Sequence, residues 1–117
     1  MQLTMRSHVW RPLTDVYETE DSVIVRVEIA GMQDEDFSVE LNGHLLSIHG
    51  FRPESTTPVN AQERRAYHQM EIRFGEFQID IELPVPVDAD QVEAIYNNGF
   101  LRIVLPKAHS HQVSLSE

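Results

Sequence analysis

The alternation of apolar and polar residues over positions 22–29 restricts the possible folds of this chain more than any other feature of its sequence. Val23, Val25, Val27 and Ile29 are separated from one another by single, mostly polar positions. Successive side chains of a β-strand point to opposite faces, so these four would line one face, whereas a helix would spread them around its axis. We therefore predict a half-buried strand.

A second alternating run, residues 77–83, predicts another strand of the same kind. The side chains expected to face inward there are Phe77, Ile79, Ile81 and Leu83. The prolines that follow end this strand, because proline cannot donate a hydrogen bond to a neighbouring strand. Residues 15–19 are predicted to form a short edge strand, and residues 33–37 and 88–92 one helical turn each.

Two Asn-Gly pairs predict two-residue hairpin turns, because both central positions of a type I′ turn need positive φ. Folding about Asn42-Gly43 is predicted to place Leu41 opposite His44, Val39 opposite Leu46 and Phe37 opposite Ile48. Folding about Asn98-Gly99 is predicted to place Tyr96 opposite Leu101, Ala94 opposite Ile103 and Val92 opposite Leu105. A slip of one residue would turn each apolar set to the wrong face.

The 117 residues suit one domain. Many short strands with turn signals between them predict an all-β, immunoglobulin-like sandwich of two antiparallel sheets. We expect the sandwich over residues 11–107, a short arm over residues 1–10 and a flexible tail over residues 108–117. The polar segment 53–66 is expected to form a flexible loop.

The charge of the chain disfavours nucleic acid and membrane surfaces as partners. Nineteen acidic residues against nine basic ones give a formal net charge of −10, which repels phosphate backbones and anionic lipid. The plainest role of this charge is solubility through self-repulsion. No run approaches the ~18 apolar residues that a membrane span needs, and the first ten residues lack the apolar core of a secretory signal. We expect a soluble, cytoplasmic protein.

Few residues in this sequence are arranged for catalysis or for binding a cofactor. Without cysteine, a disulfide, a thiolate nucleophile and a cysteine-based zinc site are excluded. His109 and His111 would face the same way in an extended tail, but no third metal ligand is near in sequence. The sequence lacks a calcium loop, a nucleophile elbow and a phosphate-binding glycine loop. We expect no enzyme, no metal and no cofactor.

The second hairpin carries the most specific resemblance. Residues 94–101, Ala-Ile-Tyr-Asn-Asn-Gly-Phe-Leu, resemble the A-x-x-x-N-G-V-L signature of the small heat-shock proteins with an alpha-crystallin domain, with Phe100 where valine is usual. Upstream, residues 12–19 resemble the opening strand of that family, and residues 29–32 (Ile-Ala-Gly-Met) resemble its L-P-G-V turn. Residues 67–71, followed by Gly75 and Phe77, resemble the segment before its seventh strand. The resemblance covers about residues 11–107.

There are also departures from the family pattern. Gln69 and Ile72 stand where the family often has arginine, and Arg73 lies one position away from the second of these. The arm of ten residues is shorter than is usual in the family, where the arm contributes strongly to client binding and higher assembly.

The resemblance implies an ATP-independent molecular chaperone, a holdase that binds partly unfolded proteins under stress and prevents their aggregation. Candidate client contacts are the groove at the edge of the sandwich and, in the arm, Met5, Val9 and Trp10. For Trp10 the alternative is packing onto the sandwich. The alternative for the whole chain is a co-chaperone-like β-sandwich module that binds one specific protein partner.

The resemblance further implies a homodimer made by strand exchange. The segment expected to reach the first strand of the partner, near Val16 and Tyr17, consists of Tyr67, His68, Gln69, Met70, Glu71 and Ile72. Such a segment would also hide an exposed strand edge. The alternative is that the segment folds back on its own sheet.

The tail holds Val113-Ser114-Leu115, which resembles a degenerate form of the I-x-I anchor of the family. Residues two apart in an extended segment point the same way, so both can fill adjacent apolar pockets. The groove that would receive them, at the sandwich edge of another dimer, is expected to be lined by Val39, Leu41, Val92 and Ala94. The alternative is a disordered tail.

Overall fold

The computed structural model describes residues 9–54 and 64–109. Within these ranges the chain forms seven strands and two single-turn 3₁₀ helices. In chain order these elements are β1 (Thr14–Glu18), β2 (Ser22–Glu28), η1 (Asp34–Asp36), β3 (Phe37–Asn42), β4 (Leu45–Arg52), β5 (Gly75–Glu82), η2 (Ala89–Gln91), β6 (Glu93–Asn97) and β7 (Phe100–Pro106). The expected edge strand and the two expected helical turns are all present.

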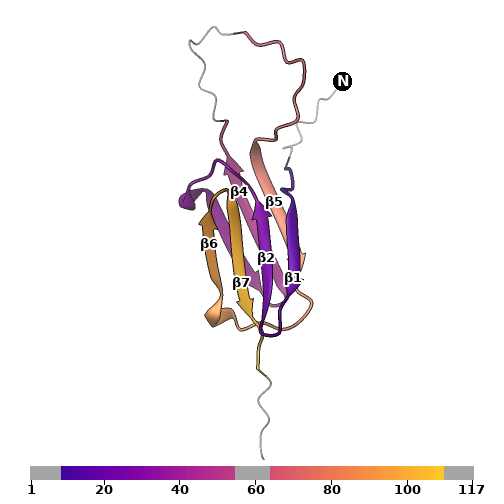
Figure 1. The fold of residues 1–117 in the computed structure, drawn as a ribbon, viewed down its shortest axis with the longest axis vertical. Coiled ribbons are helices and arrows are strands. Elements are labelled where there is room, and N and C mark those ends of the chain that lie inside the picture. Colours follow the sequence, from indigo (N-terminus) through magenta and orange to yellow (C-terminus); the bar gives the residue numbers. More distant parts are fainter. Residues whose placement is uncertain (1–8, 55–63, 110–117) are drawn as a thin grey trace, which may run out of the picture.

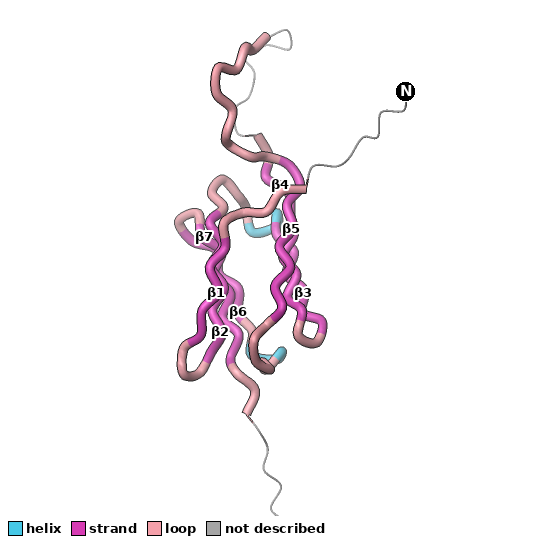
Figure 2. The backbone as a smooth tube through the Cα atoms, turned by 90° about the vertical axis from the view of Figure 1, so that its right-hand side faces the viewer, coloured by secondary structure: helices cyan, strands magenta, loops and turns pink. Residues whose placement is uncertain are grey.

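The strands form two antiparallel sheets that pack face to face, which confirms the predicted sandwich. One sheet has the order β1-β2-β7-β6 and the other β3-β4-β5; the two layers are seen from the side in Figure 2. β2 does not pair with β3, its successor along the chain. It lies beside β7 (Figure 1), and the register of this pair places Val25 opposite Ile103.

The core lies between the two sheets and consists of the inward faces predicted from the alternation. Val23, Val25, Val27 and Ile29 are fully buried. The opposing sheet and the other strands contribute Leu46, Ile48, Phe77, Ile79, Ile81, Leu83, Leu101, Ile103 and Leu105. Burial of each such side chain contributes about 1.5–3 kcal/mol, and this layer therefore supplies the main stabilisation of the domain.

The second hairpin has the predicted register. Ala94 lies opposite Ile103 and Tyr96 opposite Leu101. Asn98 and Gly99 both have positive φ, 52° and 82°, as a type I′ turn requires.

The register predicted for the first hairpin is wrong by two residues. Val39 lies opposite Ile48, Leu41 opposite Leu46 and Phe37 opposite Gly50. A shift of two residues keeps every side chain on its predicted face, because side chains alternate with a period of two.

The loop of the first hairpin is therefore Gly43-His44, since Asn42 pairs with Leu45. Gly43 has φ 61°, whereas the φ of His44 is not positive, a combination typical of a type II′ turn with glycine first. The backbone N–H of Leu83 donates to the carbonyl of His44 at 2.8 Å. This contact holds the turn against the end of β5.

The long connection between β4 and β5 leaves the sandwich at one end. Residues 64–74 form no strand and project beyond the two sheets (Figures 1 and 2). Parts of the predicted arm, loop and tail, residues 1–8, 55–63 and 110–117, lie outside the described residues. They include Met5, Val113 and Leu115.

Candidate functional sites at the edges of the sandwich

A groove lies between β3 and β6, each an edge strand of its sheet. It is a cavity of about 490 Å³ lined by Asp34, Phe37, Val39, Ala94, Ile95, Tyr96 and Leu101. Two of the four predicted groove residues, Val39 and Ala94, therefore meet in it. Leu41 does not line this cavity and is packed, partly buried, against the core; the same holds for Val92.

An aromatic pair that was not predicted from the sequence lies in this groove. The ring centroids of Phe37 and Tyr96 are 5.0 Å apart. The Tyr96 hydroxyl donates to the carbonyl of Ile29 at 2.8 Å and accepts from the backbone N–H of Met32 at 3.3 Å. Because a buried tyrosine hydroxyl needs such partners, these bonds fix the ring and give the groove a rigid apolar wall.

The predicted exchange segment is exposed and carries no β pairing within the described chain. Tyr67, Met70 and Ile72 expose 55%, 69% and 67% of their surface, which is unusual for apolar side chains so close together. The Tyr67 hydroxyl lies 3.4 Å from the Glu54 carboxylate, to which Arg65 also donates at 3.2 Å. The alternative in which the segment folds back on its own sheet is not the observed arrangement.

The predicted acceptor of the exchange segment is an open strand edge. β1 pairs with β2 on one side only, and among the described residues no strand covers its other side. Val16 and Tyr17 each expose 42% of their surface. Within one chain the structure does not pair this edge with residues 67–72.

Trp10 packs on the sandwich, which is the alternative that the sequence left open beside client contact. It is only 9% exposed and meets the Phe77 ring edge-on at 5.9 Å. Its backbone N–H donates to Glu76 O at 3.1 Å, its carbonyl accepts from the N–H of Gln78 at 3.0 Å, and its indole N–H donates to Gly75 O at 3.2 Å. Trp10 thereby covers one end of the β5 edge, whereas Val9 stays 47% exposed.

A second residue missed by the sequence analysis, Arg52, ends β4 beside Trp10. Its guanidinium carbon lies 4.6 Å from the Trp10 ring centroid and 5.3 Å from that of Phe74. Its Nε donates to the carbonyl of Arg73 at 2.9 Å, and its Nη2 donates to the same oxygen. Desolvation by burial lowers the pKa of this guanidinium, against the opposing effect of Tyr96, and the group stays charged.

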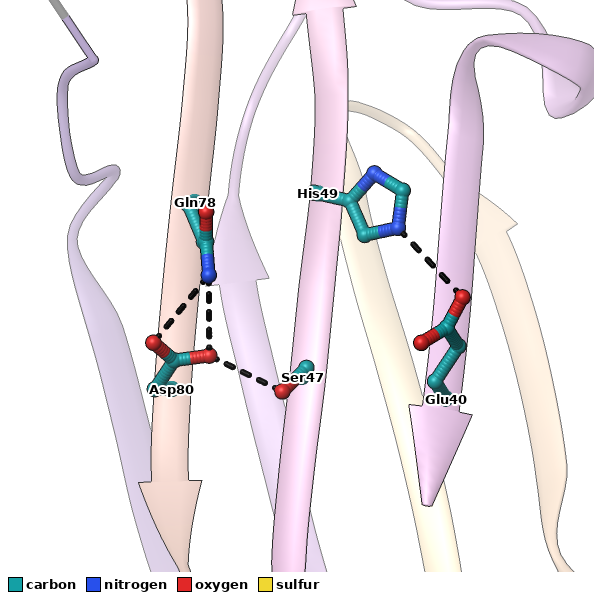
Figure 3. A network of polar contacts seen from close by, with 5 residues as sticks. All are labelled: Glu40, Ser47, His49, Gln78 and Asp80. Carbon is teal, nitrogen blue, oxygen red and sulfur yellow. Dashed lines mark hydrogen bonds and ion pairs between the residues drawn. The ribbon is translucent and has the colours of Figure 1, made fainter. Parts of the chain in front are cut away.

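The outer face of the β3-β4-β5 sheet carries several contacts between polar side chains. The Ser47 hydroxyl donates to Asp80 at 2.9 Å and the Gln78 amide donates to the same carboxylate at 3.1 Å, whereas His49 lies 3.7 Å from Glu40 (Figure 3). Across residues 9–54 and 64–109, no three His, Asp or Glu side chains gather as a metal site would need. In the same ranges no helix has the length and apolar character to cross a membrane.

Comparisons with known sequences agree with the resemblance found in the hairpin signature. The model of the Hsp20/alpha crystallin family matches residues 15–115. Heat shock protein 16 from Schizosaccharomyces pombe is 35% identical over 101 residues, which cover 86% of this chain and 69% of that protein. Small heat shock protein C2 from Rickettsia felis is 33% identical over 96 residues, 82% of this chain. This chain spans only 60% of the length of the Rickettsia protein.

Solved structures share the two-sheet arrangement. Heat shock protein 16.0 from Schizosaccharomyces pombe superposes with a TM-score of 0.73 at 32% identity, over 91% of this chain and 98% of that one. The hspA protein from Xanthomonas axonopodis gives a TM-score of 0.72 at 28% identity, over 84% of this chain and 94% of that one.

Proposed function

Because this chain belongs to the Hsp20/alpha crystallin family of small heat-shock proteins, we propose that it acts as a holdase. It binds apolar segments of partly unfolded proteins without ATP and without catalysing a reaction, and so prevents their aggregation. The observation that carries this proposal is the apolar surface left open at strand edges, at the β3–β6 groove and along residues 67–72. We propose the cytoplasm as its compartment, since a chain without cysteine suits a reducing environment.

The binding mechanism is burial of apolar client surface against these edges. Such burial contributes about 25 cal/mol per Å² and has no directional requirement. One groove can therefore accept many different apolar segments, as expected of a holdase. In this mechanism Val39, Ala94 and the Phe37–Tyr96 ring pair contact the client, whereas Trp10 is occupied by its own sandwich.

Holdase activity is tested by light scattering of a heat-aggregating client protein without ATP. We expect this chain to suppress aggregation at near-stoichiometric ratios, and an acidic control protein of similar charge to have no effect. A chain that leaves every tested client unprotected, but binds one protein tightly, would instead be a co-chaperone-like module.

The proposed working form is a homodimer made by strand exchange. Residues 67–72 of each chain add to the free side of β1 in the partner, near Val16 and Tyr17. Two observations support this geometry: the segment carries exposed apolar side chains without a partner strand, and β1 has an uncovered edge. Pairing would give the segment a partner strand and would cover the edge of β1, because an exposed strand edge offers unpaired backbone donors and acceptors.

We further propose that Val113 and Leu115, which lie outside the described residues, anchor the tail in the β3–β6 groove of another dimer. Replacing both with glycine is then expected to reduce the assembly to dimers, because the two apolar side chains that fill the groove are lost. Size-exclusion chromatography with light scattering measures the mass. Ser114→Gly is the matched control, since residue 114 would point away from the groove. An unchanged mass in the double variant would refute the anchor.

A further inference from the structure

Three segments that are distant in the sequence meet at the side chain of Arg52. The end of the arm contributes the Trp10 ring, β4 contributes Arg52 itself, and the returning end of the loop contributes the Arg73 carbonyl and the Phe74 ring. A cavity of about 430 Å³ lies beside this cluster, and its lining includes Trp10, Arg52 and Ile72. The cluster therefore borders the proposed exchange segment directly.

The contacts of Arg52 need an arginine in particular. Nε and Nη2 both donate to the oxygen of Arg73, which uses the fixed fork of the guanidinium. The same planar group lies close to the faces of the Trp10 and Phe74 rings. A lysine ammonium at this position could keep the charge, but it has neither the fork nor the plane.

Trp10 is held from two sides, by backbone and side-chain hydrogen bonds to β5 and by Arg52. Phe74 directly precedes the first residue of β5 and follows Ile72 by only two positions. The placement of Phe74 therefore determines the direction in which residues 67–72 leave the sandwich.

We propose that Arg52 is a positioning residue for strand exchange, which couples the docking of the arm at Trp10 to the orientation of the exchange segment at Arg73 and Phe74. A change in the arm then alters the dimer dissociation constant, although Trp10 lies outside the exchange segment. This inference rests on the proposed dimer for its effect on assembly, whereas the coupling itself exists within one chain.

The test compares Arg52→Lys, Trp10→Ala and the double variant with the unchanged chain. Two quantities are measured in every variant: the heteronuclear NOE of the Arg73 and Phe74 amides, and the dimer dissociation constant by sedimentation. Acrylamide quenching of Trp10, the only tryptophan, is measured in the variants that keep it. The matched control is Arg102→Lys, because Arg102 is an exposed arginine on β7 that does not line the cavity beside the Arg52 cluster.

In Arg52→Lys we expect stronger quenching of Trp10, a lower NOE at Arg73 and Phe74, and a dimer dissociation constant raised about tenfold. Trp10→Ala should lower the same NOE values and weaken the dimer. The double variant should show no lower NOE values and no higher dimer dissociation constant than Arg52→Lys alone, because the two residues act through one cluster. Arg102→Lys should match the unchanged chain in all three measurements.

The coupling is refuted if the effects of Arg52→Lys and Trp10→Ala simply add, or if Arg52→Lys behaves like Arg102→Lys. A chain that stays monomeric at every concentration would refute the exchange dimer and, with it, the role of Arg52 in assembly. The quenching and NOE measurements would then still decide whether the arm and the loop are coupled, so the two failures are distinguishable.

Discussion

Replacing Gly50 with alanine is expected to lower the free energy of unfolding by about 3 kcal/mol, the upper end of the usual cost of overpacking a core. A Cβ atom at this position would clash with the carbonyl oxygen of Asp36 and would lie 2.7 Å from Cζ of the Phe77 ring. Neither neighbour can move cheaply. The oxygen belongs to the backbone, and Phe77 is 1% exposed and packs against Trp10 and Phe37.

Urea denaturation followed by circular dichroism measures this loss. Ser38→Ala is the matched control, because Ser38 lies on the outer face of the same sheet, opposite His49, and should change the free energy of unfolding by less than about 0.5 kcal/mol. If Gly50→Ala were as stable as Ser38→Ala, the close packing of Phe77 under β4 would be wrong.

Replacing Ile72 with glutamate is expected to raise the dimer dissociation constant at least about 100-fold, which corresponds to about 2.7 kcal/mol. In the single chain Ile72 exposes 67% of its surface, so a carboxylate is well tolerated there. In the exchanged dimer the same position would be covered by the partner, and an unpaired buried charge is costly. Sedimentation over a dilution series measures the constant.

Gln69→Glu adds the same charge three positions away, on the opposite side of an extended segment, and serves as the control with a smaller expected effect. The thermal midpoint of the sandwich should not change in either variant, because both side chains are exposed in the single chain. If glutamate at position 72 left the dimer dissociation constant unchanged, another surface would hold the two chains together.

The inward faces of the strands could be predicted from the sequence because burial repeats with the same period as the strand. The alternation at Val23, Val25 and Val27 specifies a face whatever the partner strand is, and all three are fully buried. The turn of the second hairpin and its pairs of Ala94 with Ile103 and Tyr96 with Leu101 could be predicted, since Asn98-Gly99 meets the φ requirement of its turn at both positions. β6 begins at Glu93, so the predicted pair of Val92 with Leu105 is not part of the ladder.

The first hairpin shows where the same reasoning fails. A register shifted by two residues keeps every inward side chain inward, so alternation cannot distinguish Val39 opposite Leu46 from Val39 opposite Ile48. The choice is made by contacts distant in sequence. The carbonyl of His44 binds the N–H of Leu83, and the observed register places Gly50, the residue without a side chain, where the Phe77 ring needs space.

The choice between the two roles of Trp10, and the role of Arg52, could not be predicted for a related reason. Trp10 belongs to no alternating run, and Arg52 is a charged residue at an inward position of β4. Each is positioned by partners more than twenty positions away in the chain, such as Phe77 for Trp10 and Arg73 for Arg52. The groove was predicted in part: Val39 and Ala94 meet in it, whereas its aromatic wall depends on the hydrogen bonds of Tyr96 to a distant turn.

The pairing of β2 with β7 has a consequence for the synthesis of the protein itself. The valine face of β2 leaves the ribosome before β7, which is the last strand of the described chain and covers the edge of β2 that β1 leaves open. Such non-local pairing slows folding, and unpaired apolar strands invite aggregation in the meantime. Each newly made copy therefore passes through a period in which it resembles the clients that the finished protein would protect.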